Sequence, residues 1–289
     1  MNSAGIRTSP GFLTDRRQQC QALEPATIPP TSAAECSIAR PTRAAIQTAW
    51  PWQSPAADFN PVTGPISGYM DLMTTARNPL LRSAFEEIAV PRVLLDHRII
   101  TEGDEQALLA EERSAFATSV VKVQRASGAA RIVARELMRR AGMPPQPIVK
   151  SAGGMPEWPD GIVGSLAHDA TVAVAALARR ADYLSIGIDI EPAEPLAPDL
   201  LEMVATPAER VAIRDAPLGG RLLFSIKEAV YKAAYPLDRV FLDHHDVEVD
   251  LAAHTAVLRH GRIVPFVYAQ SSHIVALAFV LPPEMANAR

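Results

Sequence analysis

The segment 219–237, GGRLLFSIKEAVYKAAYPL, constrains the fold more than any other stretch of the chain. Its apolar residues recur at helical spacing: Leu222, Leu223, Ile226, Val230 and Ala233. This period predicts a helix with one buried face, beginning at Gly219 or Gly220 and ending at Pro236. The residues that follow, up to 281, alternate in short strands around a turn at Gly261, which predicts an antiparallel sheet.

The amino-acid composition limits the classes of protein to which this chain can belong. With 289 residues and 48% hydrophobic content, the chain can bury one large core or two small ones. A formal net charge of -4 gives no basic field, so we expect no nucleic-acid binding. Cys20 and Cys36 have no metal-site spacing, and no apolar run is long enough for a membrane span or a signal peptide. These features predict a cytoplasmic protein.

Three regions follow from the order of the patterns along the chain. Residues 1–65 hold nine of the 25 prolines without a sustained period, which predicts an irregular segment extending to about residue 80. Residues 81–180 and 181–285 would then form two halves, of which the second carries the acidic residues discussed below.

The first half begins with a short helix that ends before Pro91, followed by a strand. The stretch 101–145 favours one helix, capped by Thr101 or Asp104 and stopped at Gly142. Its arginines at four-residue spacing share one side of that helix, and we interpret them as a solvated basic stripe. They are Arg131, Arg135 and Arg139.

The strand SIGIDIEP, residues 185–192, carries two carboxylates in an otherwise apolar alternation. Asp189 and Glu191 project to the same side as Gly187, whereas the isoleucines between them face the opposite layer. With alpha carbons about 6.6 Å apart, both carboxylates can reach one hard cation. An edge strand with a wet polar face is the structural alternative.

In the helix, Glu228 and Lys232 are four residues apart and therefore share a face, which Ser225 and Arg221 extend. A stabilising surface ion pair explains this spacing equally well. Lys227 lies roughly 100° round the helix and is available for a separate contact.

His168, in GSLAHDA, lies at a bend between two strands, where it can donate to a phosphate oxygen or satisfy a tight connection. We interpret the adjacent His244 and His245 as structural, because neighbouring residues on a strand point to opposite faces. The chain has no G-x-S-x-G, G-x-x-x-x-G-K-[ST], G-x-G-x-x-G after a strand, or H-E-x-x-H motif, which excludes the enzyme classes that depend on them.

Taken in order, GSLAHD, SIGIDIEP and FSIKEAVYKAAYPL resemble the three signature motifs of the 4′-phosphopantetheinyl transferases, of the group that serves siderophore and other peptide or polyketide synthases. The resemblance extends over residues 105–280. It implies transfer of the phosphopantetheine arm of coenzyme A to a serine of an apo acyl, aryl or peptidyl carrier domain, leaving adenosine 3′,5′-bisphosphate. It also implies a monomeric α+β fold of two similar α/β halves, related by a pseudo-twofold axis, with the active site between them.

The resemblance further implies residue roles. Asp189, Glu191 and Glu228 would hold Mg²⁺, or Mn²⁺ in its place, and Asp189, Glu228 and Lys232 would be catalytic. Glu228 or a metal-bound water would accept the serine proton, and Lys232 would contact the pyrophosphate and its leaving oxygen. Lys227 would help to hold coenzyme A, and His168 would contact its 3′-phosphate.

The chain departs from the family pattern in the first half. Lys122 and Arg131 are kept as coenzyme A contacts, but Val123 and Gln124 stand where arginines are expected. Gly153 replaces a lysine in the following loop. Either Lys150 or Arg125 substitutes for these lost cations, or coenzyme A binds more weakly.

Two other functions need to be weighed. A metal-dependent nuclease also combines a strand Asp with a Glu and a Lys, but here the lysine follows Glu228 by four residues and no wide basic stripe is present. A degenerate, non-catalytic family member that binds carrier domains or coenzyme A is the stronger rival. The retained acidic residues argue against it, and the altered clamp argues for it.

Overall fold

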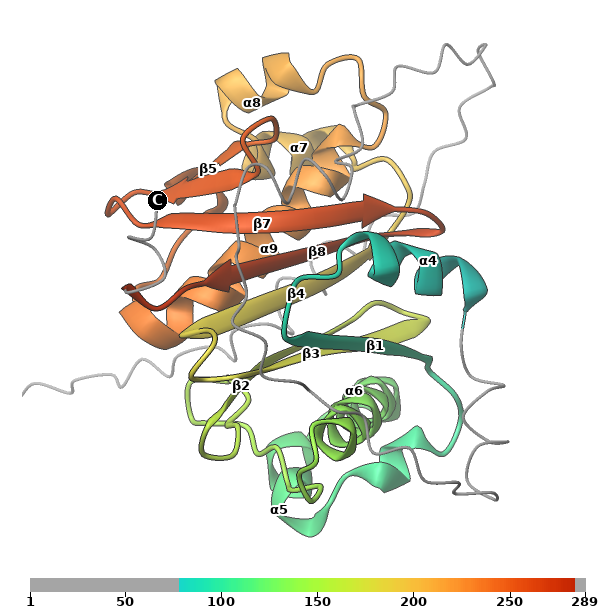
Figure 1. Ribbon diagram of the computed structural model, residues 1–289. Coiled ribbons are helices and arrows are strands. Elements are labelled where there is room, and N and C mark those ends of the chain that lie inside the picture. The colour runs from blue at the N-terminus through green and yellow to red at the C-terminus, as the bar shows by residue number, and fades with distance from the viewer. Residues whose placement is uncertain (1–77, 284–289) are drawn as a thin grey trace, which may run out of the picture.

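Two antiparallel sheets lie face to face between two long helices, so the layers follow in the order α6, first sheet, second sheet, α9 (Figure 1). The computed structural model describes residues 78–283. The first sheet has the strand order β1-β3-β2, and the second has the order β4-β8-β7-β6-β5. Helix and sheet are thus mixed, in agreement with the α+β prediction, whereas the pseudo-twofold relation between the halves stays a prediction.

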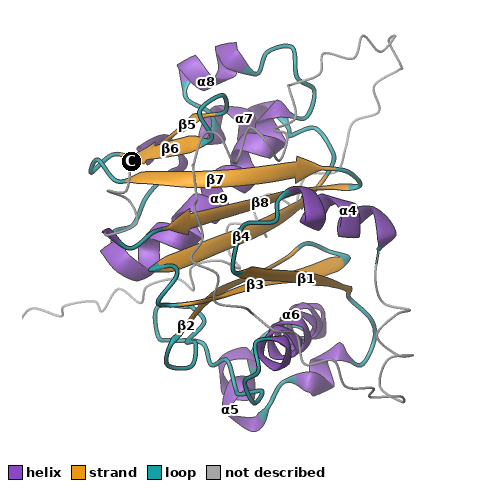
Figure 2. Ribbon diagram, viewed as in Figure 1, coloured by secondary structure: helices purple, strands orange, loops and turns teal. Residues whose placement is uncertain are grey.

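The described elements are coloured by type in Figure 2. The strands are β1 Val93–Ile99, β2 Ile162–His168, β3 Val172–Arg179, β4 Ser185–Pro192, β5 Val247–Asp250, β6 Thr255–Leu258, β7 Ile263–Gln270 and β8 His273–Val280. The helices are α4 Pro79–Glu87, η1 Asp104–Ala107, α5 Ala110–Arg113, η2 Ser114–Phe116, α6 Val121–Arg140, α7 Pro198–Val204, α8 Pro207–Ala212, α9 Gly219–Asp238 and η3 His244–Asp246.

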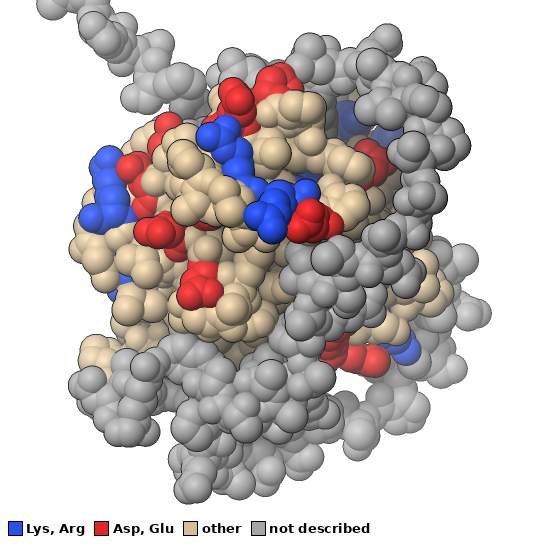
Figure 3. All heavy atoms as spheres, turned by 90° about the horizontal axis from the view of Figure 1, so that it is seen from above, with Lys and Arg blue, Asp and Glu red and all other residues tan. Residues whose placement is uncertain are grey.

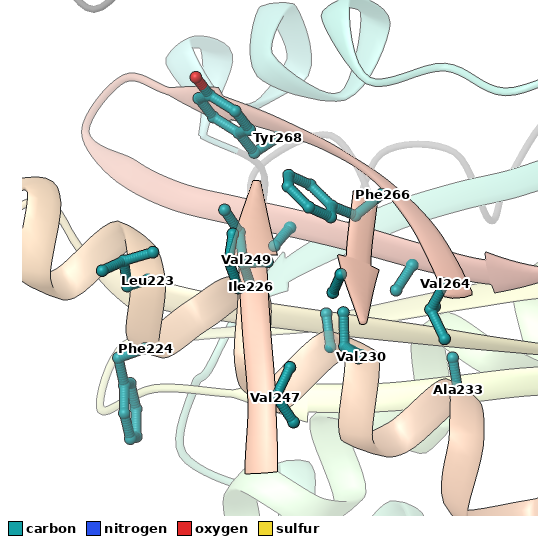
Figure 4. Close-up of a cluster of buried hydrophobic side chains, with 14 of the residues drawn as sticks. Leu223, Phe224, Ile226, Val230, Ala233, Val247, Val249, Val264, Phe266 and Tyr268 are labelled. Carbon is teal, nitrogen blue, oxygen red and sulfur yellow. The ribbon is translucent and has the colours of Figure 1, made fainter. Parts of the chain in front are cut away.

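Helix α9 begins at Gly219, as its sequence predicts, but it runs two residues beyond Pro236, so the predicted end is wrong. A proline near the end of a helix removes one hydrogen bond without closing the last turn. The turn closes instead at Arg239, which adopts a left-handed conformation and donates its N–H to the carbonyl of Tyr235 over 2.9 Å. Figure 4 shows the apolar face of α9 against the side chains of the second sheet.

The single helix expected over residues 101–142 is also wrong. Within this stretch, the only long helix is α6, Val121–Arg140. The residues before it form the short helices η1, α5 and η2. Gly103 has a φ of 92°, which breaks the helical path there. Gly128 of α6 lets η1 pack closely, because a Cβ at Gly128 would lie 2.0 Å from the carbonyl oxygen of Asp104. Gly142, with φ 75°, ends α6 as expected.

The expected solvated arginine stripe is mostly buried. Arg131 and Arg135 are only 4% and 9% exposed, whereas Arg139 is exposed. Glu112, which is fully buried, accepts a hydrogen bond of 2.9 Å from Nη1 of Arg135 and one of 2.7 Å from the amide of Ile148. The folded-back segment before α6 therefore brings a carboxylate under the arginines, and the pairing compensates their burial.

The core between the two sheets contains Ile186, Ile188 and Ile190 of β4 together with alternate residues of β3 and β8. This confirms the predicted division of β4 into an apolar face and a face that carries acidic residues. Because this core draws on both halves of the chain, the predicted boundary at residue 180 does not separate two independent cores. The proline-rich segment 1–80 lies, apart from its last three residues, outside the described residues.

Within residues 78–283, no helix has the length and apolar character that crossing a membrane requires. On the face seen in Figure 3, basic and acidic side chains lie near one another among other residues. The predictions of a monomer and of a cytoplasmic location stay predictions.

Candidate active site

Helix α9 lies directly on the face of β4 that carries Asp189 and Glu191. Gly187 makes this close approach possible, because a Cβ there would lie 2.0 Å from the carbonyl oxygen of Ala229 and 2.6 Å from the amide nitrogen of Ala233. Only a residue without a side chain fits against the helix backbone at this distance. The contact brings the polar stripe of α9 beside the two carboxylates.

The shortest contact between a carboxylate and a basic group in this site joins Asp189 and Lys232. Nζ of Lys232 lies 2.6 Å from Oδ1 of Asp189 and also donates to the carbonyl oxygen of Ile188 over 3.1 Å. The Asp189 side chain is fully buried and that of Lys232 is 11% exposed. Burying a carboxylate to this extent without a basic partner would be costly.

The other two carboxylates each lie beside a basic side chain. Oε2 of Glu191 is 3.2 Å from Nη1 of Arg221, and Oε1 of Glu228 is 3.1 Å from Nε2 of His244. The β4–α9 contact therefore gathers the predicted residues Asp189, Glu191, Glu228 and Lys232 on two packed elements.

His244 lies beside a predicted site residue, a contact that the sequence analysis did not anticipate. His244 and His245 were expected on opposite faces of a strand, but they lie in η3. There His244 approaches Glu228, and Nε2 of His245 lies 3.0 Å from the carbonyl oxygen of Glu202. No local pattern signals the His244–Glu228 contact, because the two residues are 16 positions apart on different elements.

The donor chemistry of the three carboxylates fits a hard divalent cation such as Mg²⁺, which prefers carboxylate oxygens. Among residues 78–283, however, no group of three or more His, Cys, Asp and Glu side chains is gathered closely enough to hold a metal ion. Each carboxylate instead has a basic neighbour of its own. The magnesium site therefore stays a prediction.

A cleft of about 350 Å³ opens beside Lys232, between β2, the loop that follows Lys150, and α9. Gly164 of β2 makes room for the indole of Trp158 on its wall, since a Cβ there would lie 2.5 Å from the ring. Aromatic and apolar side chains dominate the lining, which includes Met155, Trp158, Leu166, Leu184, Tyr231 and Tyr235. Such a lining suits a ligand with a long apolar part.

His168 is the last residue of β2 and is half buried, with Nδ1 3.2 Å from the carbonyl oxygen of Asp169. The next side chain, Asp169, pairs with His273 at 2.9 Å. Burial alone would raise the pKa of Asp169, but the hydrogen bonds from His273 and from the amides of Thr171 and Val172 lower this pKa to about 2. Asp169 is therefore charged at neutral pH.

The other predicted coenzyme A contacts lie around α6. Lys122 is exposed in its first turn. Arg131 and Lys150 lie over the ring of Phe116, at 4.9 and 5.7 Å from its centre. Burial, opposed by Glu112 and aided by Arg135, lowers the pKa of Arg131 to about 10. Burial and the charge of Arg131 lower the pKa of Lys150.

The positions that depart from the family pattern also have structural surroundings. Gln124 donates to the carbonyl oxygens of Phe116 and Ser119, over 3.3 and 2.8 Å. Arg125, considered as a substitute cation, pairs with Glu105 at 2.9 Å. Gly153 is exposed and lines the cleft. Gln124 thus holds a turn closed where an arginine was expected to meet the ligand.

Lys227 is buried, with 1% of its surface exposed. Its Nζ donates to Oε2 of Glu209 over 2.7 Å and to the carbonyl oxygens of Val204 and His244, each over 2.9 Å. Burial lowers the pKa of Lys227 and Glu209 opposes this shift. With its three donors engaged by protein acceptors, Lys227 has surroundings that favour a structural role over the expected coenzyme A contact.

Replacing Lys227 by Met is expected to lower the free energy of unfolding by about 3–5 kcal/mol, because Glu209 would keep a buried charge without its partner. The KM for coenzyme A is expected to stay unchanged in the folded fraction. Urea denaturation and steady-state kinetics measure the two quantities separately. A raised KM with unchanged stability would instead support the ligand contact that the resemblance implies.

Comparison with known families identifies the class of protein that this fold and site represent. A family model described as 4′-phosphopantetheinyl transferase N-terminal domain matches residues 111–178, from α5 to β3. A second, described as 4′-phosphopantetheinyl transferase superfamily, matches residues 185–278, from β4 into β8. The second match contains both elements that carry the acidic residues.

Individual relatives support the same family. The chain is 39% identical over 164 residues to 4′-phosphopantetheinyl transferase Svp of Streptomyces mobaraensis, covering 55% of this chain and 67% of that protein. It is 36% identical over 184 residues to 4′-phosphopantetheinyl transferase PptT of Mycobacterium tuberculosis, covering 62% and 78%. Enterobactin synthase component D of Salmonella typhimurium is 37% identical over 116 residues, or 36% of this chain and 45% of that protein. The chain therefore belongs to the 4′-phosphopantetheinyl transferase superfamily, as its motifs predicted.

Proposed function

We propose that this protein transfers the 4′-phosphopantetheine group of coenzyme A to a serine of an apo acyl, aryl or peptidyl carrier domain, and that adenosine 3′,5′-bisphosphate is released. The observation that carries the proposal is the pair of Asp189 and Lys232 at 2.6 Å, of which Lys232 lines an apolar cleft. A pyrophosphate presented there meets the cation of Lys232, and a long amide-containing arm meets an apolar wall.

The proposed transfer breaks the bond between the pyrophosphate bridge and the transferred phosphorus and forms a bond from the serine oxygen to that phosphorus. Glu228 takes the serine proton, and Lys232 stabilises the negative charge that develops on the leaving oxygen. Lys232 lines the cleft, and Asp189 holds its Nζ over 2.6 Å. Holding the charge in advance avoids reorganisation during the reaction.

Asp189, Glu191 and Glu228 would hold the Mg²⁺ or Mn²⁺ ion, because they are the hard oxygen donors of this site. When bound, the ion neutralises charge on the phosphoryl oxygens. Arg221 lies beside Glu191, and His244 lies beside Glu228. These pairings keep like charges on neighbouring elements from repelling one another.

On the donor side, His168 contacts the 3′-phosphate, and the cations around α6 hold the remaining anionic part of coenzyme A. They are Lys122, Arg131 and Lys150. This local charge would let a protein with net charge -4 bind a polyanion. Recognition of the carrier domain, and the siderophore or other secondary-metabolite pathway that it serves, belong to the same proposal.

A non-catalytic member that binds carrier domains or coenzyme A is the second candidate. It is favoured by Gln124, whose side chain closes a turn where the family pattern has an arginine, and by Gly153 in place of a lysine. Loss of these cations weakens the hold on coenzyme A without affecting a surface that binds carriers.

Intact-mass measurement of an apo carrier domain tests the two candidates. After incubation with the protein, Mg²⁺ and coenzyme A, the carrier is expected to gain the mass of one phosphopantetheine group, and a serine-to-alanine carrier serves as the control. Chelation of the metal is expected to stop the gain. A carrier that binds the protein but gains no mass under saturating coenzyme A would establish the non-catalytic candidate instead.

A further inference from the structure

A His–Asp contact joins two turns that belong to different sheets. Asp169 follows β2 in the hairpin to β3, and His273 is the first residue of β8. Oδ2 of Asp169 lies 2.9 Å from Nε2 of His273, and the two side chains are 9% and 12% exposed. We propose that Asp169 and His273 are positioning residues that set the distance between His168 and the acidic end of β4. This inference rests on the proposed function, since it concerns how coenzyme A spans the two halves.

On the first sheet, neighbouring residues face opposite sides. Leu166 packs toward the alanines of α6, whereas Ala167 belongs to the core between the sheets. Continuing this alternation, His168 lies on the α6 side, where the predicted cations gather, and Asp169 turns toward the second sheet. The residue next to the proposed 3′-phosphate contact is therefore the one that reaches the other half of the protein.

Both oxygens of Asp169 are used, for different purposes. Oδ1 accepts hydrogen bonds from the amides of Thr171 and Val172, over 2.6 and 2.7 Å, and so shapes its own turn. Oδ2 is left to pair with His273. A serine at this position has only one side-chain oxygen and could not reach the other sheet while also holding the turn. The carboxylate thus holds the turn and also anchors it.

On the second sheet, His273 is tied to the end of β4. Its alpha carbon pairs with Pro192, and the next pair in the register is Glu191 with Ile274. Nδ1 of His273 lies 3.1 Å from Oγ of Ser272, and the carbonyl oxygen of Ser272 accepts from the amide of Ala193 over 3.4 Å. The His273 ring is therefore fixed to the strand end that carries a proposed metal ligand.

The chemistry of coenzyme A explains why this distance matters. Its 3′-phosphate and its pyrophosphate are attached to the same ribose, so the span between the two anionic groups is nearly fixed. A protein that contacts both groups from different halves must hold those contacts at a matching distance. A misplacement of about 1 Å is enough to cost a large factor in rate or affinity. The contact between Asp169 and His273 joins the halves and supplies this constraint.

Two ligands separate the positioning role from a merely structural one. Coenzyme A carries both anionic groups, whereas 3′-dephospho-coenzyme A lacks the group that His168 would contact. We expect the full-length wild-type protein with Mg²⁺ to bind coenzyme A more tightly in isothermal titration calorimetry. His273→Ala and Asp169→Asn, which keeps the Oδ1 acceptor for the turn, are expected to lose about tenfold in affinity for coenzyme A, the factor that a charged hydrogen bond supports. Their affinity for 3′-dephospho-coenzyme A is expected to stay unchanged.

Matched controls are available in the same chain. His260 and Asp238 form another His–Asp pair at 2.9 Å, on the second half and away from the turn of Asp169. His260→Ala is expected to leave both affinities unchanged. His273→Gln places an amide donor near the position of Nε2 and is expected to recover most of the lost affinity. If His273→Ala does not fold, Asp169→Asn and His273→Gln still give the comparison.

Two results would overturn the inference while leaving the proposed function intact. One is a set of folded variants that bind coenzyme A as the wild type does. The other is an equal loss for both ligands, which would give the pair only a structural role. A wild-type protein that binds neither ligand would instead remove the proposed function, and the inference with it.

Discussion

Asp189→Asn is expected to lower the rate of phosphopantetheine transfer by at least about a thousandfold, while the protein keeps its fold. The substitution preserves the shape of the side chain but removes the charge that faces Lys232 at 2.6 Å. Under the proposed function, it removes one carboxylate from the metal site and one anchor from the lysine that stabilises the leaving oxygen. The loss of one preorganised charge contact costs about 10²–10³ in rate, and the loss of a metal ligand adds to this.

The rate constant for carrier modification, measured together with the melting temperature, tests this expectation. Glu228→Gln is expected to behave in the same way. Glu248→Gln, which changes an exposed carboxylate on β5 of the same sheet, is the matched control and is expected to keep full activity. Should folded Asp189→Asn retain more than about a tenth of the activity, the catalytic and metal roles assigned to this carboxylate would be wrong, since removing one such group costs about 10²-fold or more.

Gly187→Ala is expected to destabilise the protein by at least about 3 kcal/mol, at the upper end of the cost of overpacking a core. The added Cβ would lie 2.0 Å from the carbonyl oxygen of Ala229 and 2.6 Å from the amide nitrogen of Ala233. Both are backbone atoms, so no side-chain rotation can relieve the contact. Helix α9 must move away from β4, which also separates Lys232 from Asp189.

Chemical denaturation compares Gly187→Ala with Gly153→Ala. A Cβ at Gly153 would have its nearest neighbour, Oη of Tyr235, at 3.7 Å, and this second substitution is expected to change stability by no more than about 0.5 kcal/mol. Equal stability of the two variants would contradict the close packing of α9 on β4. Transfer by the folded fraction of Gly187→Ala is expected to be far below that of Gly153→Ala.

Several elements were predictable because local rules decide them. The apolar period of α9 and the alternation that separates the isoleucines of β4 from Asp189 and Glu191 both depend on residues within a few positions of one another. The family resemblance rested on these same segments. Their structure and the family assignment were confirmed for that reason.

The sequence did not show the contacts for which a distant segment supplies the partner. Glu112, the buried partner of Arg135, is 23 positions away from it in the chain. No helical pattern in residues 101–142 signals the break that brings Glu112 beside Arg135. The Glu209 partner of Lys227 comes from α8. The position of η3 brings His244 beside Glu228.

The amino-acid sequence alone determined which residues share a face of α9 and of β4, because helical and strand periods act over neighbouring residues. Only the tertiary structure decided which charge meets which, as in the pairs Lys232–Asp189, Arg221–Glu191 and Asp169–His273. The energy of an ion pair depends on distance and burial, and for residues far apart in the chain both are fixed only when the layers pack together.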